Sequence, residues 1–406
     1  MGGTGARLRL PALAAFASPG VCIGALAIAL TVYLPRYYAG HLGLGLATVG
    51  LVFMVVRLVD MALDPLIGVM MDRTRSALGR YRPWLLLGAP VLAIPVWLLF
   101  SPPAGVGVAW LLGWLFVYYI GASLVVLAHA SWASVIAADY HERSRVFGAI
   151  QVFGILGATL VLLIPLAVGK IASLGALVHG DPVAGMGLFV VVSAVLGIAL
   201  AGLATREHIT PETRSERFGL KDYWEMITRP DMARIIVADF CLAMGPGWMA
   251  ALYLFYFHDA RGFSIIAAGA LLLIYVAAGF LGAIGLSILA RRIGKHRTLM
   301  AASTGYSLGL VAMAFLPKGA FALAAGFMFV MGFLASSFPL LDRAMVADVG
   351  DAVRLQHGKH RVGLLYAMIT TSQKMANALS IGLSFSVLGW IGYRAGESAV
   401  NTPAAI

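Results

Sequence analysis

The chain has 406 residues, of which 61% are hydrophobic and only 12% are charged. A soluble domain carries about 25% charged residues, and a single core stops growing at about 250–300 residues, so this much apolar sequence requires lipid as its solvent. The composition excludes a disordered chain, a disulfide-stapled domain and a coiled coil. Cys22 and Cys241 lie in separate apolar stretches and indicate neither a disulfide framework nor a thiolate metal site.

Apolar runs of about 20 residues predict an all-α integral membrane protein with about eleven transmembrane helices. The helices are expected at residues 15–35, 45–70, 84–100, 107–137, 147–169, 183–204, 234–257, 264–290, 299–316, 319–346 and 361–391.

The net charge of +11 is unevenly distributed over the connections between these helices. Alternate connections, beginning with the N-terminus, hold 22 of the 29 Lys and Arg residues, whereas the opposite connections hold five. The positive-inside rule therefore predicts a plasma (inner) membrane protein with a cytoplasmic N-terminus. The excess charge is an orientation signal, so we expect the lipid bilayer and no nucleic acid as a partner.

A polar segment divides the predicted helices into two groups. We expect an N-terminal six-helix bundle at 1–204, a cytoplasmic linker at 205–234 and a C-terminal bundle of five helices at 235–406. Short basic connections at 72–83 and 291–297 occupy the same place in each half. This repetition is typical of a transporter built from two parallel halves.

Two carboxylates lie four residues apart in the second predicted helix. Asp60 and Asp64 share one helical face, and residues 1–59 contain no acidic residue. A charge within the bilayer is costly unless it is paired or lines a water-filled cavity. We predict that the two aspartates bind a cation; the alternative is that both pair with Arg57 or lie at the interface near Asp72.

Several motifs resemble a known family. The segment from Gly68 to Trp84 resembles the loop motif of the major facilitator superfamily, and Asp60 and Asp64, followed by Pro65, resemble more narrowly the glycoside-pentoside-hexuronide:cation symporters. The similarity continues through residues 139–145 and 345–351 to Lys374.

The resemblance implies a major facilitator fold of two pseudo-symmetric bundles, with twelve helices in the family. It implies alternating-access transport of a sugar or glycoside, coupled to H+ or Na+ bound at Asp60 and Asp64, with Lys374 beside that site. The sequence ends where a twelfth helix should begin, so we expect either a truncated sequence or a protein without that helix.

Lys374 is also notable without the resemblance, because it is the only lysine within a predicted helix. A buried ammonium needs a counter-ion, and Asp60 and Asp64 are the natural partners. If they share a cavity, a bound cation and the lysine compete for the same negative charge. The alternative is a lysine that extends to the membrane surface.

Four residues are predicted to bind the substrate: His129, Trp132, Thr370 and Lys374. Trp132 matches the family's sugar-stacking aromatic and Thr370 a polar pocket position. His129 lies one turn before Trp132 and is a substrate ligand, a proton relay or a packing histidine.

Several polar positions of the family are lost. The first helix has no acid, Ala128 replaces the helix-four acid, and Ile150 replaces an arginine. The losses make a lipid-like or other amphipathic solute an alternative substrate. Leu63 and Val125 leave few neutral oxygens for Na+, so the sequence favours H+.

A cytoplasmic gate is predicted from charges that follow the fourth and tenth helices. Arg143 and Arg145 in the first half are expected to pair with Asp348 and Asp351 in the second; the alternative is that these charges serve topology alone. Local pairs are expected for Asp239 with Arg234 and for Asp342 with Arg343.

No HExxH, GxSxG or P-loop motif occurs, so we expect no enzymatic activity and no cofactor. His357 and His360 lack a third ligand, so no metal site is predicted. The expected partner is a small-molecule solute, and we expect a monomer. A non-transporting membrane binding protein is the remaining alternative.

Overall fold

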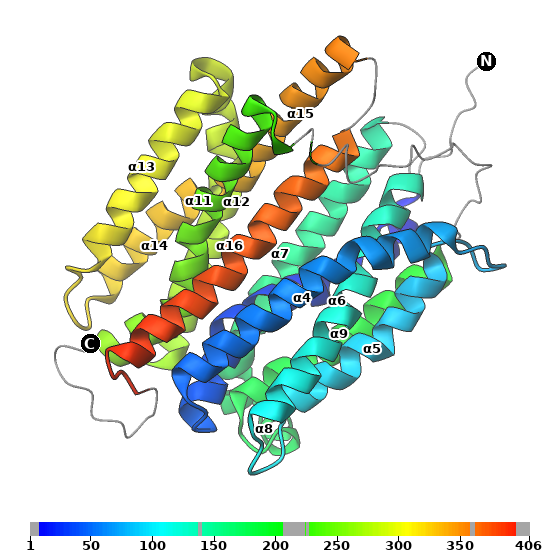
Figure 1. The fold of residues 1–406 in the computed structure, drawn as a ribbon. Helices are drawn as coiled ribbons and strands as arrows, with labels where there is room; N and C mark the ends of the chain where they lie inside the picture. The colour runs from blue at the N-terminus through cyan, green and yellow to red at the C-terminus, as the bar shows by residue number, and fades with distance from the viewer. Residues whose placement is uncertain (1–7, 137–139, 206–223, 225–226, 358–361, 395–406) are drawn as a thin grey trace. The chain divides into compact units, whose positions relative to one another are not determined.

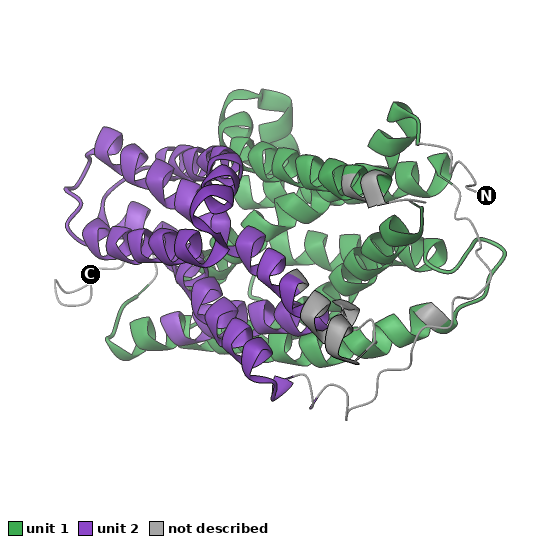
Figure 2. Ribbon diagram, turned by 90° about the horizontal axis from the view of Figure 1, so that it is seen from above, with its two compact units in different colours: residues 1–211, 385–406 green, residues 212–384 purple. Residues whose placement is uncertain are grey.

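The computed structural model describes residues 8–136, 140–205, 224, 227–357 and 362–394, and the secondary structure in these ranges is helical throughout (Figure 1). The chain divides into two compact units (Figure 2). Unit 1 comprises Met1–Pro211 and Phe385–Ile406, and unit 2 comprises Glu212–Ser384. The boundary after Pro211 falls within the segment predicted as a linker; the division into bundles at 1–204 and 235–406 stays a prediction.

Unit 1 begins with a span of 32 residues, Leu10–His41, in which short α-helical and π-helical turns follow one another. The long helices of the unit pack in a chain of neighbours: α4 on α6, α6 on α5, and α5 on α9, while α2 packs on α7. The helices of unit 1 are α1 (Leu10–Ala17), α2 (Pro19–Ile28), α3 (Leu34–Arg36), α4 (Leu46–Arg73), α5 (Arg82–Phe100), α6 (Val108–Ile136), α7 (Tyr140–Lys170), α8 (Ala172–Leu177) and α9 (Pro182–Ala204).

Unit 2 follows the same plan of long apolar helices, with α12 packed on α14 and α11 packed on α15. Its first span ends in a π-helical turn at Phe255–Ala260, as the first span of unit 1 does at Tyr37–His41. The helices of unit 2 are α11 (Pro230–Leu254), α12 (Ile265–Ile293), α13 (Lys295–Met313), α14 (Phe321–Ala335), α15 (Ser337–His357) and α16 (Val362–Trp390), the last of which ends in residues assigned to unit 1.

Nine helices of the described ranges are long and apolar enough to cross a membrane. Each of the eleven predicted ranges has a helical counterpart. Two predicted ranges, which correspond to α13 and α16, are not among the nine. Helix α13 begins with the basic residues 295–297. Helix α16 contains a polar patch at 370–374, which lowers its mean hydropathy. The predicted all-helical membrane architecture is therefore present.

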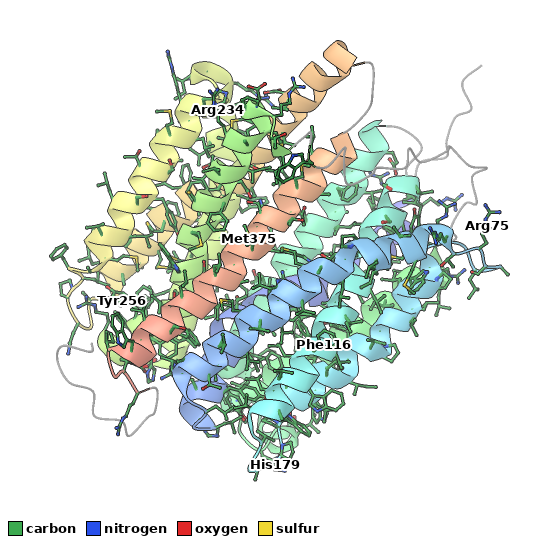
Figure 3. The ribbon with its side chains drawn as sticks, viewed as in Figure 1. Arg75, Phe116, His179, Arg234, Tyr256 and Met375 are labelled. Carbon is green, nitrogen blue, oxygen red and sulfur yellow. The ribbon has the colours of Figure 1, made fainter. Side chains whose placement is uncertain are left out.

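The side-chain view places labelled residues at the two ends of each unit (Figure 3). Arg75, in the basic connection after α4, and His179, in the connection before α9, lie at opposite ends of unit 1. Arg234 and Tyr256 likewise lie toward opposite ends of the first span of unit 2. The basic Arg75 connection and the connection that holds His179 thus lie at opposite ends of unit 1.

Close approach of α2 and α7 depends on glycine. A Cβ atom added at Gly157 would lie 1.9 Å from the carbonyl oxygen of Val21, and one added at Gly24 would lie 1.8 Å from the carbonyl oxygen of Gly154. Membrane helices gain contact area from such small residues because lipid supplies no hydrophobic driving force between them. These contacts fix the position of the N-terminal span in unit 1.

Candidate functional site

Three side chains from two helices of unit 1 form a polar cluster in which Asp60 and Ser123 are buried and Asp64 is half-buried. Asp60 and Asp64 lie one turn apart on α4, on the face that packs against α6. The Ser123 hydroxyl of α6 lies 2.8 Å from Oδ1 of Asp60 and 2.6 Å from Oδ1 of Asp64. Asp60 is 1% exposed and Ser123 is 5% exposed. The two predicted carboxylates therefore meet at one hydroxyl group inside the unit.

Arg57 lies beside this cluster. Its Nη1 atom donates to Oδ2 of Asp60 at 3.1 Å, and its guanidinium lies 4.8 Å from the ring centre of Tyr119. Asp60 thus forms an ion pair with Arg57 and also contacts Ser123. The ion pair is the alternative to cation binding that the sequence left open. An ion pair alone does not account for a hydroxyl that contacts both carboxylates; the side chain of Asp72 lies outside those described.

The cluster has fewer protons than acceptors. A serine hydroxyl carries one hydrogen, whereas an ionised carboxylate can only accept. Ser123 therefore donates fully to one carboxylate at a time, and one added proton supplies the missing donor. Two short oxygen contacts thus share one hydroxyl hydrogen, and Arg57 balances charge at Asp60.

Ser123 is the residue that sequence reasoning missed. The resemblance to the family pointed to position 125 for a helpful hydroxyl, and valine stands there. In the structure, Ser123 supplies a hydroxyl to both carboxylates from a position two residues earlier. A serine within an apolar helix was the available signal, although sequence alone does not say which face of α6 meets α4.

His129 and Trp132 lie together on α6, packed against Phe16 of α1. Nε2 of His129 is 2.8 Å from the carbonyl oxygen of Phe16, and the two rings are 4.9 Å apart. Trp132 is fully buried, and its ring meets Phe16 edge to face at 5.2 Å. Among the described residues, Nε1 of Trp132 has no hydrogen-bond partner. His129 makes the contacts of a packing histidine here. Binding of the substrate by His129 and by Trp132 stays a prediction.

Thr370 and Lys374 lie on α16 in unit 2, where Thr370 is exposed and Lys374 is half-buried. They belong to a different unit from Asp60 and Asp64. The expected approach of Lys374 to the two carboxylates therefore stays a prediction.

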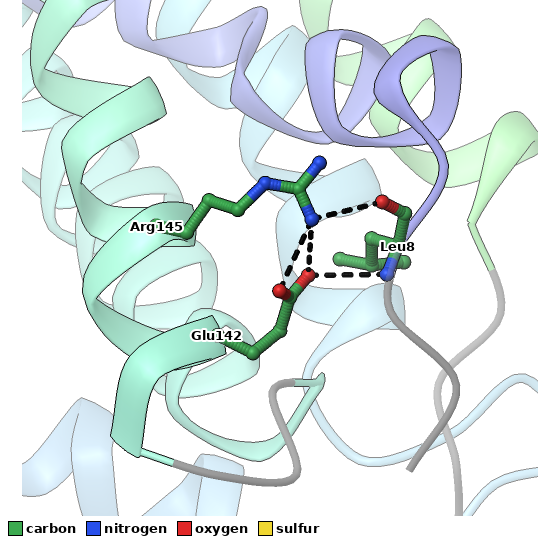
Figure 4. Close-up of polar contacts among 3 residues, drawn as sticks. All are labelled: Leu8, Glu142 and Arg145. Atoms are coloured by element: carbon green, nitrogen blue, oxygen red, sulfur yellow. Dashed lines mark hydrogen bonds and ion pairs between the residues drawn. The ribbon is translucent and has the colours of Figure 1, made fainter. Parts of the chain in front are cut away.

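The charges of the expected cytoplasmic gate have partners inside their own units. Arg145 pairs with Glu142 at 2.9 Å and donates to the carbonyl oxygen of Leu8 at 3.0 Å, while the Leu8 amide donates to Glu142 (Figure 4). In unit 2, Asp348 pairs with Lys295 at 2.7 Å. The side chains of Arg143 and Asp351 lie outside those described, so the gate stays a prediction.

Unit 2 contains a cavity of about 310 Å³ whose wall includes polar side chains of three helices. Asp239 of α11 and Gln373 and Asn377 of α16 line it, with Tyr275 of α12. Nε2 of Gln373 donates to Oδ1 of Asp239 at 2.8 Å. Asp239 thus has a described partner other than Arg234, the partner expected from the sequence.

No group of three potential metal ligands occurs among the described residues. His360, one of the two histidines considered from the sequence, lies outside them.

Comparison with known proteins shows the family to which this chain belongs. The sequence matches the family described as MFS/sugar transport protein over residues 15–406. The chain belongs to this family. It is 26% identical to the uncharacterized symporter YjmB of Bacillus subtilis (strain 168), covering 92% of this chain and 82% of the relative. It is 25% identical to the isoprimeverose transporter of Lactiplantibacillus pentosus, covering 91% and 78% of the two chains.

The fold has solved counterparts. The structure of the nucleoside transporter NupG superposes with a TM-score of 0.66, at 13% identity, and the match covers 95% of this chain and 91% of that one. At this identity the similarity shows the fold alone. Together with the family match, it confirms the predicted major facilitator fold and the resemblance to the cation symporters. The protein is a multi-pass membrane transporter rather than an enzyme.

Proposed function

We propose that this protein is a proton-coupled symporter of a sugar or glycoside that works by alternating access. The observation that carries the proposal is the Ser123 hydroxyl, which contacts both Asp60 and Asp64 inside the membrane-spanning part of unit 1. Relatives named as an isoprimeverose transporter and a lactose permease support the substrate class.

A proton fits this cluster better than Na+. When one carboxyl is protonated, its hydroxyl donates to Ser123 and the serine donates to the other carboxylate, so every short contact has a donor. Hard cations are held in proteins by several oxygen ligands. The cluster offers three such side chains, and one oxygen of Asp60 is already occupied by Arg57.

The other predicted residues take roles around this site. Trp132 and His129 in unit 1, with Thr370 and Lys374 in unit 2, contact the solute, and Lys374 competes with the coupling ion for the negative charge of Asp60 and Asp64. Arg143, Arg145, Asp348 and Asp351 close the cytoplasmic mouth by ion pairs. For Arg145 and Asp348, these pairs replace the present ones with Glu142 and Lys295. The N-terminus faces the cytoplasm, and the monomer transports.

An amphipathic glycoside is the second candidate substrate. Ala128 replaces a family acid, and Ala128 and Trp132 are both fully buried beside apolar neighbours. A solute with a large apolar part needs fewer hydroxyl-binding groups than a simple sugar does.

The experiment is uptake into proteoliposomes with an imposed H+ or Na+ gradient, using lactose, isoprimeverose and alkyl glycosides. We expect a proton gradient to drive accumulation by the wild type, and Asp60→Asn and Asp64→Asn to abolish accumulation. Exchange of solute at equal concentrations on both sides needs no net proton transfer and should persist in the variants. Accumulation at the wild-type level by both variants would contradict the site assignment.

A further inference from the structure

A pair of buried carboxyl groups lies in unit 2. Asp239 of α11 is 3% exposed and Asp342 of α15 is 1% exposed, and both belong to membrane-spanning segments. The two helices pack on one another, and the two carboxyl groups are within interaction distance of each other.

Three of the four carboxyl oxygens of this pair have no hydrogen-bond partner among the described residues. Oδ1 of Asp239 accepts from Gln373 at 2.8 Å, whereas Oδ2 of Asp239 and both oxygens of Asp342 are buried without a partner. A buried carboxylate oxygen without a donor is costly, because its lost hydration is not replaced. Gln373 and the adjacent Ser372 hydroxyl act on Asp239, and the three remaining oxygens of the pair accept no hydrogen bond from the described residues.

Neighbouring cations do not supply a donor to these oxygens. Arg343 follows Asp342 on α15 and acts electrostatically on both carboxyl groups, but it does not donate to the three partnerless oxygens. Lys374 follows Gln373 on α16, and it does not donate to the partnerless oxygens either. The remaining titratable side chain on the wall is Tyr275, whose helix, α12, also packs against α15.

Asp239 borders a space that water can occupy. This residue lines the cavity of about 310 Å³ described above, with Gln373, Asn377 and Ser336. The cavity is large enough for several water molecules, each of which occupies about 30 Å³ in the liquid. Water there can deliver a proton to Asp239, and the adjacent carboxyl group of Asp342 can share it.

We propose that Asp239 and Asp342 together bind one proton, so that unit 2 carries a proton-binding site of its own. Two carboxylates in contact within a medium of low dielectric constant cannot both remain ionised at acceptable cost. A proton from cavity water forms one O–H bond, and that hydroxyl donates to the other carboxylate. One hydrogen thus gives the pair its missing donor, and the titration belongs to the pair.

The site is separate from the proposed coupling site and does not depend on it. Gln373, which donates to Asp239, lies on the same helix as Thr370 and Lys374. Loss of the shared proton changes the charge beside this helix. Solute binding should therefore depend on pH even when Asp60 and Asp64 cannot titrate.

Infrared difference spectroscopy on the full-length protein in lipid tests the proposal. We start from the Asp60→Asn/Asp64→Asn variant, which removes the proposed coupling site, and titrate pH in the absence of solute. We expect a protonated-carboxyl carbonyl band that shifts in D₂O and disappears when Asp342→Asn or Asp239→Asn is added. Asp348→Asn, which alters an exposed aspartate paired with Lys295, should leave the band unchanged.

Three results would overturn the proposal. The first is absence of the band from the Asp60→Asn/Asp64→Asn variant. The second is a band that remains in both the Asp342→Asn and the Asp239→Asn variants. The third is loss of the band when Na+ is added at constant pH. The same Asp342→Asn and Asp239→Asn changes in the wild type provide a second measurement if the combined variants fold poorly. Failure of the coupling-site proposal leaves this readout intact, because the band is measured without transport.

Discussion

At the scale of single residues, the arrangement at Ser123 shows how a neutral side chain decides what two acids can do. Asp60 and Asp64 are one turn apart on the same helix, and without a shared group they would repel each other. The hydroxyl from α6 joins them, and Arg57 balances part of their charge. The cluster needs all of these contacts because its members lie within the bilayer, where unpaired charge is costly.

Ser123→Ala tests the hydroxyl directly. Leaving a buried acceptor without its donor costs about 1–3 kcal/mol, so we expect a lower thermal stability and roughly a tenfold lower rate of gradient-driven uptake. Ser123→Thr keeps the hydroxyl and should retain uptake. Ser134→Ala is the matched control, because Ser134 lies on the same helix and bonds only to the carbonyl of Ser131. Uptake by Ser123→Ala at the wild-type rate would contradict a role for Ser123 in the site.

The same scale shows the limit of sequence reasoning. Asp60 and Asp64 could be found because acids inside an apolar run are rare and costly. Ser123 could not, because a serine satisfies its hydroxyl on its own helix in many places, as Ser193 and Ser287 do. Asp239 was expected to pair with Arg234 because the two lie close in sequence, but its described bond is to Gln373 on a distant helix. Contacts between helices depend on rotation, which apolar composition does not specify.

At the scale of helices, sequence reasoning located the elements and erred mainly at their ends. The predicted helix at 147–169 corresponds to α7, which begins at Tyr140, and the predicted helix at 319–346 corresponds to α14 together with α15, which continues to His357. Hydropathy reports only the part of a helix that lipid covers. The backbone continues its own hydrogen bonds through the polar residues that follow.

The contact between α2 and α7 gives a prediction at this scale. Gly157→Ala places a methyl group where the Val21 carbonyl lies, so we expect a loss of about 1–3 kcal/mol in stability and a lower melting temperature. Gly148→Ala on the same helix has no atom within 4 Å of the added carbon and should be neutral or slightly stabilising. Equal melting temperatures for the two variants would contradict the close packing.

At the scale of the whole molecule, two units of similar plan carry different polar groups. Unit 1 holds the carboxylates bridged by Ser123, and unit 2 holds the pair beside a cavity. The repeated basic connections and the polar segment between them predicted a division into two halves, which stays a prediction. The partners of Arg145 and Asp348 were not, because both residues use neighbours within their own unit.

The most direct test of the central claim is simultaneous measurement of solute and ion movement in proteoliposomes without an imposed gradient. Addition of a transported glycoside should move protons in the same direction as the solute, recorded with a pH-sensitive dye, and replacing Na+ with K+ should have no effect. Asp64→Asn should abolish the proton movement. Uptake that requires Na+ and moves no protons would contradict the account.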